Sequence, residues 1–147
     1  MPEAHAGTGT AFYTRVSGKL GVRAARSDRE LASLVERRLP AESVRSLVRS
    51  GLSDEEAYQL IVPRRTLAHR FARQQPLSLE ESDKALRVAR TIAFAEQVFG
   101  DAERSWRWLR KPKAQFDGKP PIEMLATEAG ARLVEELIAQ IDDGLAA

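Results

Sequence analysis

Three serines in this sequence are each followed three residues later by a glutamate, ahead of apolar residues at helical spacing. The pairs are Ser27/Glu30, Ser53/Glu56 and Ser78/Glu81. In such a capping box the serine hydroxyl accepts a hydrogen bond from an amide of the first helical turn, and the glutamate carboxylate accepts one from the amide of the serine. Because three helices start in this way and no segment alternates as a strand does, the sequence predicts an all-α fold.

Apolar spacing and helix-breaking residues set the limits of eight helices. Pro40 and Pro63 stand at boundaries, where the missing amide hydrogen costs little, and Gly51 and Gly100 suit helix ends. The expected helices cover residues 28–38, 41–50, 53–61, 64–74, 79–98, 102–110, 121–126 and 128–141. Residues 1–26, which begin with a stretch rich in Gly, Ala and Thr, are expected to form a flexible arm.

Composition excludes several classes of protein. The 147 residues contain no cysteine, which rules out disulfides and thiolate metal sites. No apolar run reaches the roughly 20 residues that span a bilayer, and the first residues lack the apolar core of a signal peptide. We therefore expect a cytoplasmic protein that does not enter a membrane.

Charge is divided unevenly along the chain. Residues 1–76 carry 13 Lys/Arg and 8 Asp/Glu, a net charge of +5, whereas residues 77–147 carry 10 and 13, a net charge of −3. A basic first half suits contact with phosphates, and an acidic second half suits a basic protein partner.

Residues 53–76 have the pattern of a helix-turn-helix. A capped helix ends at Val62-Pro63 and a second helix opens on two arginines, while Leu60 and Leu67 can supply a shared apolar contact. The second helix of such a motif enters the major groove of DNA, where arginine binds guanine edges and phosphates. The pattern leaves open that this is only a basic, solvated helix face within a bundle. The residues expected to contact DNA are Arg64, Arg65, Thr66, His69, Arg70 and Arg73.

The segment FGDAERSWRWLRKPKAQFDGKPPIEMLATEAG, residues 99–130, predicts a rigid corner between two helices. Asp101 can cap a helix that carries both tryptophans, and Pro112 helps to end it. Asp117-Gly118 suits a tight turn, and Pro120-Pro121 hold the chain extended before a short helix. Such a corner presents a fixed surface to a partner.

These residues resemble the toxin-binding domain of the Xre/MbcA/ParS antitoxins, whose pattern reads vFGd…WL…P…l.G.sPlelL.te.Ga..V…L..i..G. The preceding segments RRTLAHRF and LSLEESDKALRVAR resemble the Xre-like helix-turn-helix of the same antitoxins. Together the two resemblances cover about residues 27–144. The positions that match the C-terminal pattern are Phe99, Gly100, Asp101, Trp108, Leu109, Pro112, Phe116, Gly118, Pro121, Leu125, Thr127, Gly130, Val134, Leu137, Ile141 and Gly144.

The resemblance implies a division of the chain and a function. The expected parts are the arm over residues 1–26, a helix-turn-helix region over 27–76, a connecting or dimerisation helix over 77–98 and a toxin-binding domain over 99–147. The resemblance further implies an antitoxin that forms a homodimer and covers the active site of a RES-type, NAD-degrading toxin with its C-terminal domain. It also implies that the antitoxin binds operator DNA and represses its own operon.

The acidic tail suggests how an NAD-binding toxin would be blocked. Such enzymes usually need cationic groups for the pyrophosphate, and the carboxylates of Asp142 and Asp143 could meet those cations. Gly144 and Leu145 follow them and are assigned to the same contact. The other interpretation is a solvated helix end.

Three more residues of the second half are assigned to the toxin contact: Trp106, Lys113 and Asp117. Trp106 and Trp108 cannot both lie on one side of a helix. Because Trp108 matches an apolar position of the family pattern, Trp106 is expected to face the partner. Lys113 belongs to a basic run that could contact the toxin, nucleic acid or only solvent.

No group of residues indicates catalysis. His5 and His69 are far apart in the sequence, and the acidic pairs Glu135-Glu136 and Asp142-Asp143 have no nucleophile or base arranged beside them. We therefore predict no catalytic residues, no metal and no cofactor. One alternative function is a DNA-binding transcriptional regulator without a toxin partner. Another is an interaction module whose helix-turn-helix no longer binds DNA.

Overall fold

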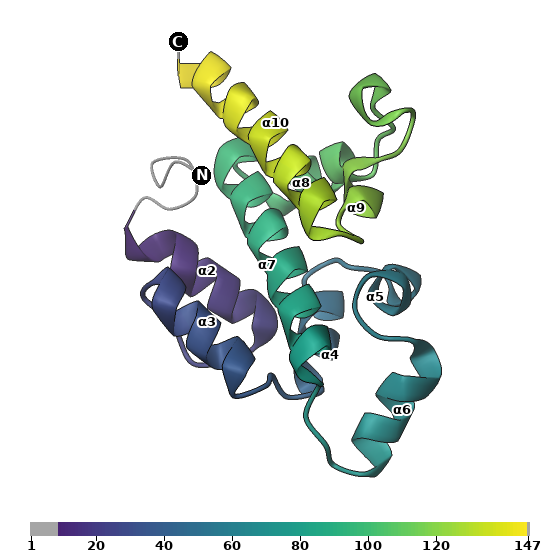
Figure 1. Ribbon diagram of the computed structural model, residues 1–147. Helices are drawn as coiled ribbons and strands as arrows, with labels where there is room; N and C mark the ends of the chain where they lie inside the picture. Colours follow the sequence, from purple (N-terminus) through teal and green to yellow (C-terminus); the bar gives the residue numbers. More distant parts are fainter. Residues whose placement is uncertain (1–8, 147) are drawn as a thin grey trace.

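The computed structural model describes residues 9–146, with side chains as far as Gly144. Within this range the chain contains helices and no strands (Figure 1), which confirms the predicted all-α fold. No helix among these residues is long and apolar enough to cross a membrane. The elements are α2 (Thr10–Leu20), α3 (Asp28–Glu36), α4 (Glu42–Arg49), α5 (Asp54–Leu60), α6 (Arg64–Ala72), α7 (Leu79–Phe99), α8 (Ala102–Leu109), the 3-10 helix η1 (Ala114–Phe116), α9 (Pro121–Met124) and α10 (Glu128–Ala146).

The predicted capping boxes explain where two of these helices begin. At the start of α5, the Glu56 amide donates to Ser53 Oγ at 3.1 Å and the Ser53 amide donates to Glu56 Oε1 at 2.9 Å. Ser78 and Glu81 form the same pair at the start of α7. At α3, Ser27 accepts from the Glu30 amide, but the Glu30 carboxylate accepts from the amide of Arg26 instead. The third box is therefore formed only in part.

Helix α7 is the central element, and both halves of the chain pack against it. Its 21 residues span about 31 Å at 1.5 Å per residue. Figure 1 shows α2 and α3 along one side, α10 and α8 toward its C-terminal end, and α6 near its N-terminal end. Small buried residues such as Ala85, Ala89 and Ala93 let these helices approach closely. The apolar face of α7 is used inside the chain, as suits a connecting helix, and a dimerisation role for residues 77–98 stays a prediction.

The first described helix corrects the prediction of a flexible arm over residues 1–26. Helix α2 buries Phe12, Val16 and Leu20, which lie four residues apart on one face and pack against α7. Lys19 Nζ and Arg15 Nη1 also bind the buried carboxylate of Glu96, at 2.7 and 3.3 Å. The prediction is therefore wrong for residues 10–20, while residues 1–8 lie outside the described residues.

Trp106 forms the first of two contacts, which we call joints, that hold the rear helices (α8–α10) to the rest of the chain. The Trp106 side chain is 8% exposed, and its Nε1 donates to the Ser50 carbonyl at 3.1 Å. The indole lies so close to Gly51, whose φ is +124°, that a Cβ there would overlap the ring. Arg110 lies over the same indole and donates to both carboxylate oxygens of Glu56, at 2.8 and 3.0 Å. The end of α8 is thereby fixed to the turn between α4 and α5.

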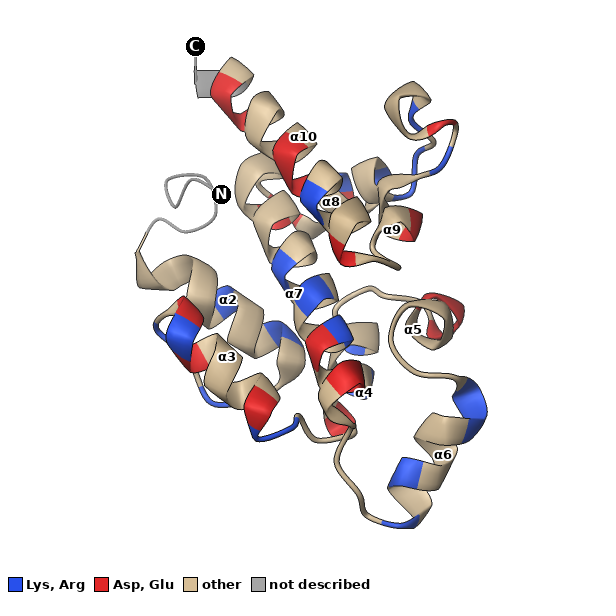
Figure 2. Cartoon of the chain, in the orientation of Figure 1, with Lys and Arg blue, Asp and Glu red and all other residues tan. Residues whose placement is uncertain are grey.

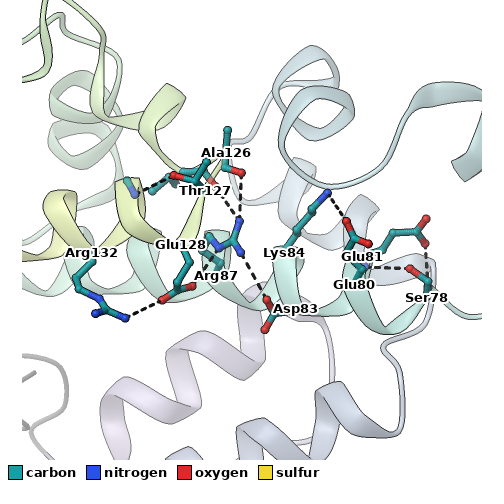
Figure 3. A network of polar contacts seen from close by, with 12 residues as sticks. Ser78, Glu80, Glu81, Asp83, Lys84, Arg87, Ala126, Thr127, Glu128 and Arg132 are labelled. Carbon is teal, nitrogen blue, oxygen red and sulfur yellow. Dashed lines mark hydrogen bonds and ion pairs between the residues drawn. The ribbon is translucent and has the colours of Figure 1, made fainter.

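The second joint is made by Arg87 of α7 (Figure 3). Its guanidinium donates to the carbonyls of Leu125 and Ala126 at 3.4 Å and to Glu128 Oε1 at 3.3 Å. Thr127 Oγ1 accepts from the Gly130 amide at 2.9 Å, as expected for a residue that caps α10. Arg87 therefore holds the start of α10 against the middle of α7.

Candidate functional site

Helix α6 is the second helix of the predicted helix-turn-helix, and it projects at one end of the molecule (Figure 1). The turn before it buries Ile61 and Val62, and α6 itself buries Leu67. Phe71 is half-buried, with the Arg45 guanidinium 3.7 Å from the centre of its ring. These apolar contacts hold one face of α6 and leave the opposite face in solvent.

The exposed face of α6 carries most of the residues predicted to contact DNA. Arg64, Arg65, His69 and Arg73 are exposed, and Thr66 is half-buried. Within the described residues, Arg64, Arg65 and Arg73 form no ion pair. Figure 2 shows their basic segments on both ends of α6. These guanidinium groups are free to bind an anionic partner.

Arg70 differs from these arginines, because it is half-buried and bound to a carboxylate, so its contact with DNA stays a prediction. Its Nε and Nη2 donate to the two carboxylate oxygens of Glu81 at 3.2 and 3.1 Å. Burial by itself would raise the pKa of Glu81, but the hydrogen bonds from Arg70 and from the Ser78 amide outweigh it and lower the pKa. Arg70 therefore fixes α6 to the start of α7, and its charge is balanced by Glu81.

The prediction that Trp106 faces a partner is wrong, because its ring fills the joint with the Ser50–Gly51 turn. A sequence signal for this was available: Trp106 and Leu109 are three residues apart, so they share one helix face, and Leu109 is fully buried. The prediction followed the match of Trp108 to the family pattern instead of this spacing.

Trp108 is the tryptophan that reaches the surface. It is half-buried, its ring lies 5.3 Å from that of Phe99, and Lys113 Nζ lies 4.9 Å from its ring centre. Burial and the neighbouring Lys111 lower the pKa of Lys113. The ammonium group of Lys113 and the indole of Trp108 thus form a cation–π pair that a protein partner could cover.

Asp117 lies in the exposed loop after η1. Its φ of +54° is in the left-handed region, which aspartate tolerates better than most residues. The loop is held by backbone hydrogen bonds from Gly118 to Lys113 and from Lys113 to Lys119. The corner predicted from the sequence is therefore a closed, ordered turn.

The acidic tail lies at the end of α10, which extends beyond the other helices (Figure 2). Asp142 is half-buried, while Asp143 and Gly144 are exposed. The backbone of Leu145 belongs to α10, but its side chain lies outside the described residues. In Figure 1 this end and the loop around η1 lie on different sides of the rear helices, so the residues assigned to the toxin contact do not form a single cluster.

A cleft of about 590 Å³ lies between α7 and α10. Burial raises the pKa of half-buried Glu135 in its wall, against the opposing influence of Arg90. Arg90 is itself bound to Asp28 at 3.0 Å, and Arg132 is bound to Glu128 at 4.0 Å. The charged residues of the cleft thus largely neutralise one another.

Comparisons with known families match the chain in two consecutive parts. Residues 30–90 match the antitoxin Xre-like helix-turn-helix domain. Residues 94–144 match the antitoxin Xre/MbcA/ParS C-terminal toxin-binding domain. The first match ends within α7, and the second begins within it and includes α8, α9 and most of α10.

Each of three curated relatives is named as an antitoxin. The chain is 37% identical over 133 residues to Antitoxin Xre of Pseudomonas putida KT2440, covering 90% of this chain and 84% of that protein. It is 31% identical over 88 residues to the Prs ADP-ribosylating antitoxin of Sphingobium sp. YBL2, covering 54% of this chain and 55% of that protein. It is 29% identical over 85 residues to Antitoxin Xre of Yersinia enterocolitica, covering 57% of each.

Proposed function

The chain belongs to the Xre family of antitoxins, and on that premise we propose that it neutralises a RES-type, NAD-degrading toxin by covering the toxin's active site with α8–α10. Membership makes it a toxin-binding protein rather than an enzyme. The observation that carries the finer proposal is the toxin-binding-domain match over residues 94–144. The two joints support it, since a platform that is held rigidly loses little conformational freedom when a partner binds.

NAD is the expected substrate of the toxin for two reasons. The resemblance to the Xre/MbcA/ParS antitoxins implies a RES-type partner, and the Sphingobium relative carries ADP-ribosylation in its name. NAD is the donor in ADP-ribosylation and is also the substrate of NAD hydrolysis. Both reactions break the bond between nicotinamide and ribose, so both require a site that binds the pyrophosphate of NAD.

Two surfaces of the rear helices are suited to the toxin. One is the Trp108–Lys113 pair, which is partly exposed and apolar at its centre. The other runs along α10, where Leu133 is 48% exposed and is followed toward the tail by half-buried Leu137 and Ile141. An apolar row that leads to Asp142 and Asp143 would place these carboxylates against the toxin.

The first experiment measures NAD loss caused by the product of the neighbouring gene, with and without this protein. We expect NAD loss to stop near stoichiometric addition. Transfer of labelled ADP-ribose to a protein, measured in the same reaction, separates NAD hydrolysis from ADP-ribosylation. A neighbour that neither consumes NAD nor forms a complex with this chain would contradict the proposal.

The role of the tail is tested by reversing its charge. In Asp142→Lys/Asp143→Lys, the two ammonium groups would be repelled by the cations that bind pyrophosphate, so inhibition should weaken while complex formation through α8 and α10 remains. The matched control is Glu55→Lys, an exposed acidic residue of α5, outside the α8–α10 surface. Inhibition equal to that of the wild type in the tail variant would rule out this mechanism.

DNA binding through α6 is the second part of the proposal, and with it repression of the protein's own operon as a homodimer. The free arginines of α6 favour it. Because each phosphate contact releases counterions, Arg64→Gln/Arg65→Gln should make the affinity for DNA less sensitive to salt. If DNA binding is strong and no protein co-purifies, the alternative function, a regulator without a toxin, would be preferred.

A further inference from the structure

The arginines of this chain fall into two groups. Ten of the 18 form ion pairs with carboxylates, whereas eight form none within the described residues. All eight lie in the first half of the chain, although carboxylates occur throughout it. The eight are Arg23, Arg26, Arg29, Arg37, Arg38, Arg64, Arg65 and Arg73.

Of these arginines, Arg64 and Arg65 belong to α6 and Arg73 directly follows it. Four others, Arg23, Arg26, Arg37 and Arg38, form what we call the α3 arginine patch, at the loop before α3 and at the end of that helix. A groove of about 460 Å³ runs between Arg23, Arg26 and Arg37. All four side chains are exposed.

Three acidic residues, Asp28, Glu30 and Glu36, lie near the α3 arginine patch, and Glu30 lines its groove. Asp28 binds Arg90 of α7 at 3.0 Å. The Glu30 carboxylate accepts from the backbone amide of Arg26 and so completes the start of α3. Residues 23–38 hold five arginines and three acidic residues, and Asp28 is paired outside this segment, so the patch keeps a net positive charge.

Arg38 occupies a position that favours glycine. Its φ is +66°, and its amide donates to the Val35 carbonyl at 2.9 Å, as at a left-handed helix end. A side chain with a Cβ costs about 1–2 kcal/mol in this conformation, which makes a long cation an expensive choice for a helix end. This cost is a reason, independent of the charge, to assign the guanidinium a role outside the fold.

The segment after the patch is tied to the start of α7 and to the loop before it. The Leu39 carbonyl, next to Arg38, accepts from the Leu77 amide at 2.9 Å, and the Leu39 amide donates to Ser82 Oγ at 2.8 Å. The first bond holds the loop after α3 against the loop after α6, which begins at Arg73, and the second holds it against α7. In Figure 2, α6 and the end of α3 lie at the lower end of the molecule, away from the acidic end of α10.

We propose that the α3 arginine patch binds the phosphate backbone of DNA, beside the segment contacted by α6. The inference rests on the proposed DNA binding of α6 and extends it to a second surface. Guanidinium groups bind phosphate oxygens in a bidentate manner, and such contacts position a protein on DNA without reading its sequence. DNA is favoured over the toxin because the patch lies at the opposite end of the molecule from the acidic tail.

The test compares three double variants of the full chain on two DNA duplexes of equal length, one from upstream of its own gene and one of random sequence. The variants are Arg37→Gln/Arg38→Gln in the patch, Arg64→Gln/Arg65→Gln in α6, and Arg104→Gln/Arg107→Gln in α8 as the control. The control arginines are as exposed but are paired with Asp101 and Glu103. Affinity is measured as a function of salt concentration.

For the patch variant we expect the slope of log affinity against log salt to decrease in magnitude by about 1–2, since each phosphate contact contributes about 0.9. Its affinity should fall by the same factor on both duplexes, while the control keeps the slope of the wild type. Thermal unfolding shows whether the fold is intact. If position 38 does not tolerate the change, Arg23→Gln/Arg26→Gln tests the same patch.

The outcomes separate the two proposals. An unchanged slope for the patch variants, together with a reduced slope for the α6 variant, overturns this inference and leaves DNA binding by α6 standing. Absence of salt-dependent DNA binding by the wild type overturns both. Weaker inhibition of the toxin by the patch variant, with DNA binding intact, also overturns the inference and assigns the patch to a protein partner.

Discussion

Helices α6 and α8 are short, lie in different halves of the chain, and each carries arginines, but the two sets of arginines have different surroundings. In α8, Arg104 and Arg107 bind acidic residues of their own helix start, and Arg110, just after the helix, binds Glu56 of α5. In α6, only Arg70 has such a partner. The arginines of α8 are thus already paired with carboxylates, whereas Arg64 and Arg65 of α6 remain available for a ligand.

The comparison teaches that net charge is a poor guide to where a protein binds an anion. What matters is whether the guanidinium groups are already neutralised. Ion pairs at the surface contribute little stability, so their distribution is not imposed by folding. An excess of unpaired arginines in one region therefore points to a ligand.

The largest effect should come from the joint that holds the rear helices in place. Trp106→Ala removes a buried ring and leaves the Ser50 carbonyl without its donor, so we expect a loss of ~3–5 kcal/mol in the free energy of unfolding. Trp108→Ala is the matched control, because Trp108 is half-buried. Urea denaturation measures both variants. An equal loss in the two would show that Trp106 does not hold the two halves together.

The next effect concerns the glycine that faces Trp106. Gly51 and Gly118 both have positive φ, +124° and +86°, but only at Gly51 would a Cβ overlap the indole. We expect Gly118→Ala to cost about 1–2 kcal/mol for backbone strain. Gly51→Ala should cost more, because the indole must also move. Thermal unfolding compares the two variants. Similar melting temperatures would contradict the close packing of Gly51 against the Trp106 indole.

A smaller effect is expected at the ion pair between Arg110, just after α8, and Glu56 of α5. Burial would raise the pKa of Glu56, but the hydrogen bonds from Arg110 and the Ser53 amide lower it below the ordinary value of 4.5. The carboxylate therefore stabilises the fold above the unfolded-state pKa, and this stabilisation is lost as pH falls through the lower, folded-state pKa. Glu56→Gln should cost about 1–2 kcal/mol at neutral pH.

Glu81→Gln tests the equivalent pair at the front, with Arg70. Burial would raise the pKa of Glu81 too, but the hydrogen bonds from Arg70 and the Ser78 amide lower it, so its stabilisation is lost over the same acidic range. Chemical denaturation from neutral to acidic pH should show a smaller loss of stability on acidification in each variant than in the wild type. An identical pH dependence would mean that these carboxylates are not bound by arginine in solution.

The smallest effect on stability belongs to the free arginines. Arg64→Gln/Arg65→Gln should change the free energy of unfolding by no more than about 0.5 kcal/mol, as is usual for surface residues without partners. Arg110→Gln should cost more, because it leaves half-buried Glu56 without its cation. Differential scanning calorimetry compares the two. A large loss in the α6 variant would show that its arginines are structural, like those of α8.

The helices that the sequence predicted best have strong local signals. The helices at α5 and α7 begin at complete capping boxes, and the predicted starts, residues 53 and 79, lie within one residue of the observed ones. Helix α2 was missed although Phe12, Val16 and Leu20 form an apolar stripe. It has no side-chain cap and contains Gly18, so its stability comes mainly from packing on α7.

For the candidate site, sequence reasoning placed the free arginines of α6 correctly on an exposed face, but it misplaced two residues. Arg70 and Trp106 are less exposed than predicted because their partners, Glu81 and Ser50, belong to other elements. Ser50 is 56 residues away from Trp106 in the sequence. Helical periodicity reports which residues share a face, but it does not report what that face meets.

Glu56 and Glu81 each make one contact that the sequence predicts and one that depends on the tertiary structure. The sequence by itself determined that each begins a helix, because the contact with a serine three residues earlier depends only on local geometry. Only the tertiary structure decided that each would also bind an arginine from another element. The Arg110–Glu56 contact joins residues 54 positions apart, and it forms because α7 brings α8 back to the turn before α5. Which arginines remain free for DNA is a consequence of that packing.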